Sequence, residues 1–269
     1  MHILVCLKQV VDQDIPPRAF RVNRAERRAD APGAPLVMSL FDANALEVAL
    51  QLRDSRGAGS SVTALSLGPR SAEEVLGKAL GLTANAAVLL HDPMLLGCDS
   101  TGVATAIAAA ARRMAATGTP IDVILTGRQA GDWEHGQTGG MVAEALGWPC
   151  LTFVSRLRGD AGGLEAQREV EDGHEIIRVR PPVVATITND ETNRLRPAKA
   201  RDIMLAHRAA IATWGIADLG LDPARLAPRT RSVDLVIPEN QVRCERIEGQ
   251  TAAEKARALA RRLRELGIV

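Results

Sequence analysis

The sequence predicts an α/β fold: an open, mostly parallel sheet with helices on both faces, followed by a C-terminal arm. Two observations lead to this prediction. Short apolar runs at 2–10, 61–67, 86–90 and 121–126 alternate with segments of helical periodicity, which is typical of parallel sheets. After residue 149 the alternation gives way to a hairpin pattern, an Arg-rich stretch and a Pro-containing linker.

Helical patterns fill the intervals between the apolar runs. The segment 42–54 has apolar residues at helical spacing, and Asp42 is expected to cap its amino end. Ser71 and Glu74 have the spacing of a capping box ahead of the next helix. The segment 101–114 is rich in Ala, the residue with the highest helix propensity.

The second half begins with antiparallel elements. The segments 164–170 and 175–180 are expected to pair as a hairpin around Asp172-Gly173. A further strand is predicted at 183–188, and a helical pattern follows near 198–212.

The C-terminal part has the character of an arm. Residues 222–238 form a linker with several prolines, and a capping box from Thr251 to Glu254 opens a final amphipathic helix. We therefore divide the chain into an α/β domain at 1–190 and a second functional part, with the C-terminal arm, at 191–269.

Composition limits the class of protein. The 33 Lys and Arg residues balance 32 Asp and Glu, so the charge gives no support for a general nucleic-acid or membrane surface. Three Phe, three Trp and no Tyr disfavour base-stacking platforms. The four cysteines form no C-x-x-C and the five histidines have no metal spacing, so we expect no metal site and a reducing, cytoplasmic setting. Neither a secretory leader nor a bilayer-spanning run is expected.

The segment 127–149 is the most informative part of the chain. It follows an apolar run and crosses a polar, Gly-rich turn before an amphipathic helix. A strand, such a turn and a helix start together present backbone N–H groups at the positive end of a helix dipole, which suits a phosphate. Asp132 and Glu134 call for a ligand that also has hydrogen-bond donors, such as a ribose. The segment therefore predicts a nucleotide site.

The predicted topology places other residues near this segment. In open α/β sheets, ligands bind beyond the carboxyl ends of the strands. Cys6, Leu67 and Gly127 each close a predicted strand, so we expect them along one edge of the sheet.

The same segment resembles the adenine-nucleotide loop of the electron transfer flavoprotein (ETF) beta subunit family, which includes FixA-like members. The family pattern is close to G-[KR]-Q-A-x-D-x-x-x-x-Q-[TV]-G followed by A-x-x-L-x-W-P. Four more family motifs are approximated in the right order, at 3–10, 39–47, 66–69 and 168–185. Five ordered motifs are far more specific than one.

The resemblance implies an electron carrier subunit with no catalytic residue. It would pair with an ETF alpha subunit, bind AMP at its own sheet edge and help to bury an FAD carried mainly by alpha. Electrons would come from flavin dehydrogenases and pass to a quinone oxidoreductase or a similar acceptor. The residues expected at the cofactors are Cys6, Ser39, Leu40, Phe41, Asp42, Leu67, Gly127, Arg128, Gln129, Ala130, Gly131, Asp132, Trp133, Glu134, His135, Gly136, Gln137 and Thr138.

Two of these residues also have simpler interpretations. Phe41, which matches an aromatic residue beside the flavin ring in the family, could pack in the core instead. Arg128 could reach a phosphate or form a surface ion pair.

The resemblance also implies residues that face partner proteins. Glu169 matches a glutamate thought to control the mobile flavin domain of the alpha subunit, and the C-terminal arm would wrap that subunit. Asn193, Arg196 and Ala200 lie in the loop that would recognise an electron donor, with Ala200 where the family has Leu. Gln13 stands where many members have a Tyr near the flavin.

Two alternative functions stay open. An electron-bifurcating ETF beta subunit would hold a second FAD in place of AMP and tends to carry D-G-D-T-x-Q-V-G. Thr138 and the lack of D-G-D-T favour AMP, and the bulk of Trp133 and Glu134 disfavours a longer dinucleotide. A nucleotide-binding module or an ATP-dependent enzyme of the same superfamily is the other class. The enzyme would need S-G-G-x-D-S after the first strand, where residues 8–12 read KQVVD.

Overall fold

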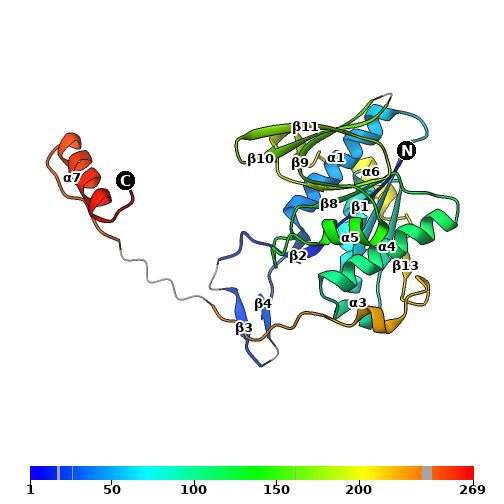
Figure 1. Ribbon diagram of the computed structural model, residues 1–269. Helices are drawn as coiled ribbons and strands as arrows, with labels where there is room; N and C mark the ends of the chain where they lie inside the picture. The colour runs from blue at the N-terminus through cyan, green and yellow to red at the C-terminus, as the bar shows by residue number, and fades with distance from the viewer. Residues whose placement is uncertain (17–18, 26, 161, 238–243) are drawn as a thin grey trace. The chain divides into compact units, whose positions relative to one another are not determined.

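The computed structural model describes every residue except 17–18, 26, 161 and 238–243 (Figure 1). The chain forms two compact units, Met1–Arg21 with Ala29–Val233, and Val22–Arg28 with Asp234–Val269. The larger unit contains a nine-stranded, mostly parallel sheet flanked by helices, which confirms the predicted fold class.

The strands of this sheet lie in the order β11-β10-β9-β12-β8-β1-β6-β7-β13. Parallel pairing runs from β9 to β13, and β10 and β11 extend the sheet as an antiparallel hairpin. The strands are β1 (His2–Cys6), β6 (Ser61–Leu67), β7 (Ala86–Leu90), β8 (Val123–Gly127), β9 (Cys150–Asp160), β10 (Gly163–Val170), β11 (Gly173–Val179), β12 (Val183–Ile187) and β13 (Ala212–Trp214).

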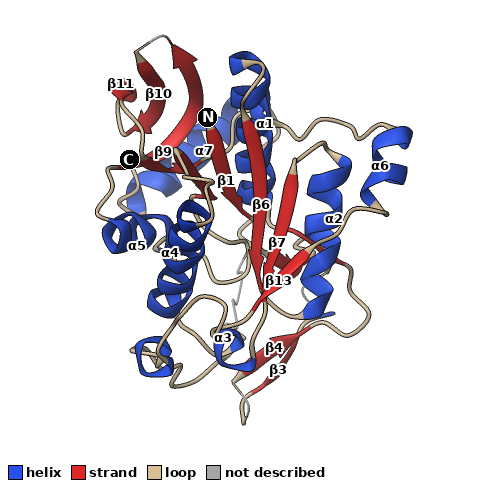
Figure 2. Cartoon of the chain, turned by 90° about the vertical axis from the view of Figure 1, so that its right-hand side faces the viewer, coloured by secondary structure: helices blue, strands red, loops and turns tan. Residues whose placement is uncertain are grey.

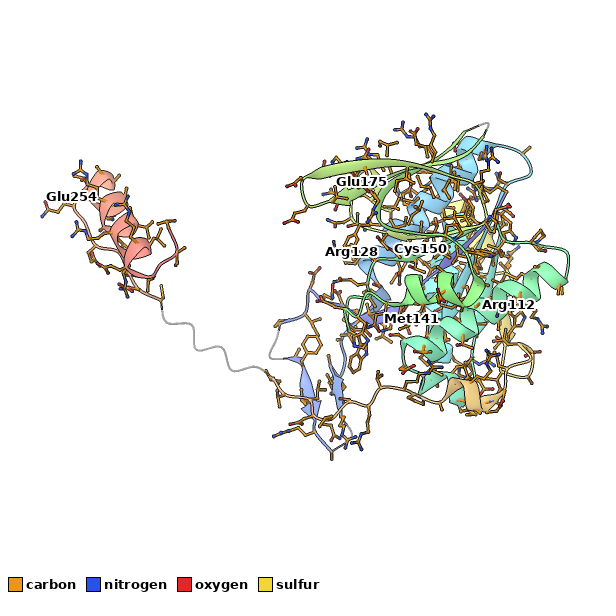
Figure 3. All side chains as sticks on the ribbon, viewed as in Figure 1. Arg112, Arg128, Met141, Cys150, Glu175 and Glu254 are labelled. Atoms are coloured by element: carbon orange, nitrogen blue, oxygen red, sulfur yellow. The ribbon has the colours of Figure 1, made fainter. Side chains whose placement is uncertain are left out.

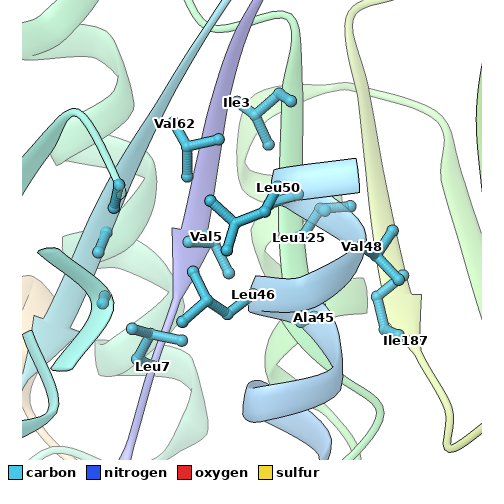
Figure 4. Packing of buried hydrophobic residues seen from close by; sticks show 14 of the residues in the cluster. Ile3, Val5, Leu7, Ala45, Leu46, Val48, Leu50, Val62, Leu125 and Ile187 are labelled. Atoms are coloured by element: carbon cyan, nitrogen blue, oxygen red, sulfur yellow. The ribbon is translucent and has the colours of Figure 1, made fainter. Parts of the chain in front are cut away.

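Helices cover both faces of the parallel part (Figure 2). Ile3 and Val5 of β1 pack against the helices that cover one face of the sheet, α1 (Leu40–Arg56) and α2 (Glu73–Gly81). Figure 4 shows the packing against α1 from close by. Leu4, between Ile3 and Val5, points to the other face with α4 (Ser100–Ala116) and α5 (Thr138–Leu146). Because alternate residues face opposite sides and both sides are covered, the strands are apolar throughout.

Shorter elements complete the described chain. β2 (Gln9–Val11) pairs with β5 (Leu36–Met38), and β3 (Arg21–Asn23) with β4 (Arg28–Asp30), in two-stranded sheets. The remaining helices are α3 (Pro93–Leu96), α6 (Ala200–Ala206) and α7 (Ala252–Glu265), with 3₁₀ turns at Arg70–Ala72, Glu191–Asn193 and Pro223–Leu226. No described helix is both long and apolar enough to cross a membrane.

The predicted single strand at 2–10 is wrong, because the run divides into β1 and β2. Both backbone polar groups of Lys8 bond to the start of α1: its N–H donates to the Asp42 carboxylate, and its carbonyl accepts the Ser39 N–H. These bonds interrupt the ladder, and the chain then pairs with β5.

Two predicted helix caps are also wrong. Ser39, not Asp42, is the N-cap of α1, which begins two residues before the predicted start, and Asp42 lies in the first turn. Ser71 belongs to a 3₁₀ turn, and its hydroxyl donates to the side-chain oxygen of Gln9 instead of capping α2. In both cases a contact with a distant segment replaces the local one.

The second half agrees with the sequence in part. The hairpin β10–β11, strand β12 and the capping box of α7 are confirmed. Strand β9 was not predicted. The helix expected near 198–212 is shortened to α6, because the chain continues into β13 and pairs with β7. The end of the predicted linker, Pro238, lies outside the described residues, and the division of function at residue 190 stays a prediction.

Candidate functional site

Asp42 joins three elements at the carboxyl edge of the sheet. Its carboxylate accepts the N–H of Lys8, just after β1, at 2.8 Å and the N–H of Gly127, the last residue of β8, at 2.9 Å. A Cβ at Gly127 would lie 2.5 Å from the Asp42 carboxylate, so this approach requires glycine. The start of α1 is thereby fixed to the ends of both central strands.

Burial decides the electrostatics of this carboxyl. It raises the pKa of Asp42 to about 7, against the opposing effect of the N–H donors of Lys8 and Gly127 and the charge of Lys8. Burial, with the nearby Asp42, also raises the pKa of the Cys6 thiol well above its ordinary value. Cys6 therefore stays protonated and belongs to the apolar core.

The loop between β8 and α5 is tethered to the region after β1. The Lys8 ammonium lies 2.7 Å from both carboxylate oxygens of Asp132. The Gly131 N–H donates to the Ser39 hydroxyl at 3.3 Å, and the Gly131 carbonyl accepts the side-chain amide of Gln13. These contacts place the predicted ribose-binding carboxylate beside the ends of β1 and β8.

The amino end of α5 lies directly on the sheet. A Cβ at Gly139 would collide with Thr186 of β12 and Thr126 of β8, so the glycine lets the helix start close to both strands. Its N-cap residue, Gln137, makes no side-chain cap bond, and the buried Thr126 hydroxyl has no hydrogen-bond partner in the described structure. An uncapped helix start with a spare hydroxyl is suited to an anionic ligand.

The tip of this loop faces solvent. Trp133 is 54% exposed, and its ring centroid lies 5.6 Å from that of His135. Glu134 and Gly136 have φ values of 52° and 62°, in the left-handed region. The tip is therefore a tight turn with left-handed backbone residues, and its polar and aromatic side chains are accessible to solvent.

Arg128 follows β8 directly (Figure 3) and lies over two aromatic rings. Its guanidinium carbon is 4.5 Å from the ring centroid of Phe41 and 5.7 Å from that of Phe153. The surface ion pair considered for Arg128 is not formed with any described carboxylate. No pattern in the sequence indicates a role for Phe153, because no strand is predicted at the position of β9.

The remaining predicted cofactor residues lie on the same edge with different exposure. Leu67 closes β6 next to β1, and Leu40 is exposed at the start of α1. Gln129 and Ala130 are half-buried, as is Thr138 at the first position of α5.

The predicted partner residues have contacts within the chain. The buried Asn193 amide donates to the Ser155 carbonyl at 2.5 Å. Arg196 pairs with Glu47 at 2.9 Å and Asp54 at 2.7 Å, and the hydrogen bond to Glu47 is the main reason that its pKa is raised. Ala200 is exposed at the start of α6, and Glu169 lies on β10 opposite His174.

A cavity of about 420 Å³ lies elsewhere, lined in part by Asp122, Trp148 and Pro181. Asp122 precedes β8, Trp148 precedes β9, and Pro181 precedes β12. The cavity therefore lies at the amino edge of the sheet. It contains none of the predicted cofactor residues, and the carboxyl edge has the polar groups that a nucleotide needs.

Residues 31–219 match the electron transfer flavoprotein domain. The chain belongs to the electron transfer flavoprotein family.

Curated relatives agree with this assignment. Protein FixA of Azorhizobium caulinodans is 35% identical over 225 residues, which cover 82% of this chain and 78% of the relative. Electron transfer flavoprotein subunit beta of Clostridium acetobutylicum is 34% identical over 226 residues, or 84% and 83%. The caffeyl-CoA reductase-Etf complex subunit CarD of Acetobacterium woodii is 32% identical over 275 residues and the full length of both chains.

These matches confirm the resemblance to ETF beta subunits. This ETF chain is an electron transfer flavoprotein subunit, a carrier of electrons and not an enzyme.

Proposed function

We propose that this ETF chain is the beta subunit of a heterodimer, binds AMP in the loop 127–138 and helps to enclose an FAD held mainly by an alpha subunit. The carboxyl edge of the sheet is the observation that supports this proposal. It combines an uncapped helix start, a Gly-rich turn and a carboxylate held in place by Lys8. These are the groups that phosphate and ribose need.

The residues at this edge fit the parts of AMP. The backbone at the start of α5 would hold the phosphate, and Asp132 would accept hydrogen bonds from ribose hydroxyls. The unpartnered Thr126 hydroxyl offers one more polar contact beside the helix start. FAD would supply the redox chemistry, while the side chains of this chain set the surroundings and access of its ring.

Partner proteins follow from the same proposal. The relative CarD is named as a subunit of an Etf complex, which supports an alpha partner for this chain. We propose flavin dehydrogenases as electron donors and a quinone oxidoreductase or a similar protein as acceptor. Glu169 would act at the mobile flavin domain, and the segment with Asn193, Arg196 and Ala200 would face a donor.

Nucleotide content is the measurement that tests this function. The chain, purified with its alpha subunit, is expected to release one FAD and one AMP per heterodimer on denaturation, as separated by chromatography. Two FAD and no AMP would assign the chain to the electron-bifurcating alternative. A colourless monomer that hydrolyses ATP would contradict the proposal and favour an ATP-dependent enzyme.

The Asp132→Ala variant makes that measurement specific for the loop. Loss of a hydrogen bond to a charged group costs about 1.5–3 kcal/mol, so AMP affinity is expected to fall roughly 10- to 150-fold. Asp14→Ala, which removes an exposed carboxylate outside the loop, is the control and is expected to retain AMP. Equal AMP retention in both variants would exclude Asp132 from the site.

The C-terminal helix α7 is expected to bind the alpha subunit. None of its side chains is buried, and Leu259, Leu263 and Leu266 recur at helical spacing. Leu259→Ser combined with Leu263→Ser should weaken the heterodimer at least tenfold, measured by analytical ultracentrifugation. Arg257→Ser combined with Arg261→Ser alters the opposite face as a control. Unchanged assembly of the leucine variant would assign α7 another role.

A further inference from the structure

The guanidinium of Arg128 has donors that the described chain does not use. Its Nε is buried and has no hydrogen-bond partner, and its Nη1 makes a long contact of 3.4 Å with the Thr188 hydroxyl. No described carboxylate forms an ion pair with it. A buried donor without an acceptor costs about 1–3 kcal/mol. The arrangement therefore points to a ligand that brings an acceptor or a negative charge.

Two rings make the surroundings of this cation apolar. Phe41 comes from the first turn of α1, and Phe153 from β9. Phe153 has a φ of 56° and is 45% exposed, a combination that is rare for a bulky residue. Such backbone strain persists where the surrounding structure holds it and is frequent at ligand sites. A cation among accessible aromatic rings suits a planar aromatic ligand that also carries hydrogen-bond acceptors.

The contacts of Arg128 differ from those of the helix start where the AMP phosphate is proposed to lie. Its guanidinium lies over Phe41 of α1 and Phe153 of β9, and bonds to the Thr188 hydroxyl after β12. The start of α5 lies on the face of the sheet opposite α1, where Gly139 meets Thr126 and Thr186. The proposed phosphate site at that helix start is therefore made of groups other than those that Arg128 contacts.

We propose that Arg128 is a positioning residue for the flavin ring, held by Phe41 and Phe153 so that its charge lies beside the ring and favours reduction. This inference rests on the proposed function, because the alpha subunit would bring the FAD. Adding an electron to the oxidised, neutral ring makes it negative. A nearby cation lowers the free energy of that product more than that of the neutral ring, and so raises the first reduction potential.

The test uses the complex with the alpha subunit and two substitutions. Arg128→Gln removes the charge, and Arg128→Lys keeps it. Spectroelectrochemical titration of the flavin is expected to show a first-electron equilibrium at least tenfold less favourable in Arg128→Gln, a fall of about 59 mV. Arg128→Lys should restore most of this loss, and the AMP content of both variants is measured alongside the potential.

Arg113 provides a matched control, since it is also an arginine over an aromatic ring. Its guanidinium carbon lies 4.8 Å from the ring centroid of Trp214. Trp214 belongs to β13, four places from β8 in the sheet, which is roughly 19 Å at the usual strand spacing. Arg113→Gln loses the same kind of contact and should leave the potential unchanged.

The outcomes separate the possible ligands. Loss of AMP with an unchanged potential would assign Arg128 to the AMP phosphate and overturn the inference. No change in either the AMP content or the potential would also overturn it. If Arg128→Gln does not assemble, Phe153→Leu decides: a lower potential supports the inference, and an unchanged one overturns it. A complex without flavin would reject the proposed function itself, and this inference with it.

Discussion

Replacing Asp42 with alanine is expected to lower the free energy of unfolding by about 2–6 kcal/mol. The substitution leaves the N–H groups of Lys8 and Gly127 without their acceptor, and each buried donor without a partner costs about 1–3 kcal/mol. Asp42→Asn should cost less, because its amide oxygen can still accept one of these bonds. Urea denaturation followed by circular dichroism measures both losses.

Asp42 should also make stability depend on pH. Its pKa is raised by burial from 3.8 to about 7, so the folded protein holds this proton more tightly than the unfolded chain. The resulting stabilisation is complete below about pH 4 and is lost as the pH rises through about 7. Relative to Asp42→Asn, which cannot titrate there, the wild type should therefore lose stability between about pH 4 and 7. Parallel pH profiles for the two proteins would show that burial does not raise the pKa of Asp42 in the folded protein.

Replacing Glu47 with alanine is expected to cost about 2–4 kcal/mol. The Glu47 side chain is 6% exposed and accepts bonds from the Arg196 backbone N–H at 3.0 Å and from its guanidinium at 2.9 Å. Removing one partner of a buried pair typically costs 3–5 kcal/mol. The effect should be smaller here because Arg196 keeps its contact with Asp54.

Asp54→Ala is the matched control for Glu47→Ala. Asp54 pairs with the same arginine but is 44% exposed, and exposed ion pairs contribute about 0–1 kcal/mol. Hydrogen exchange should also become faster at residues 193–200 in Glu47→Ala, because the pair fixes this segment to α1. Equal losses of stability in the two variants would show that burial of Glu47 is not what makes the pair strong.

Local patterns in the sequence were sufficient for the central strands of the parallel sheet and for the family. Strands β6 and β7 have the predicted bounds, because a strand covered on both faces is a continuous apolar run whatever its neighbours are. The capping box of α7 was also predictable, because both of its partners lie within one turn. The ordered motifs led to the ETF beta family in the same way, since each is read from consecutive residues.

The tertiary structure alone decided how the edge of the sheet is assembled. Asp42 looked like a helix cap, yet its carboxylate binds Lys8, 34 residues earlier, and Gly127, 85 residues later. Arg128 and Phe153 meet because β9 and β8 both flank β12, a sheet order that no local pattern encodes. Strand β13 exists through its pairing with β7. In each case the deciding free energy comes from contacts between distant segments, which form only when the strands take their places in the sheet.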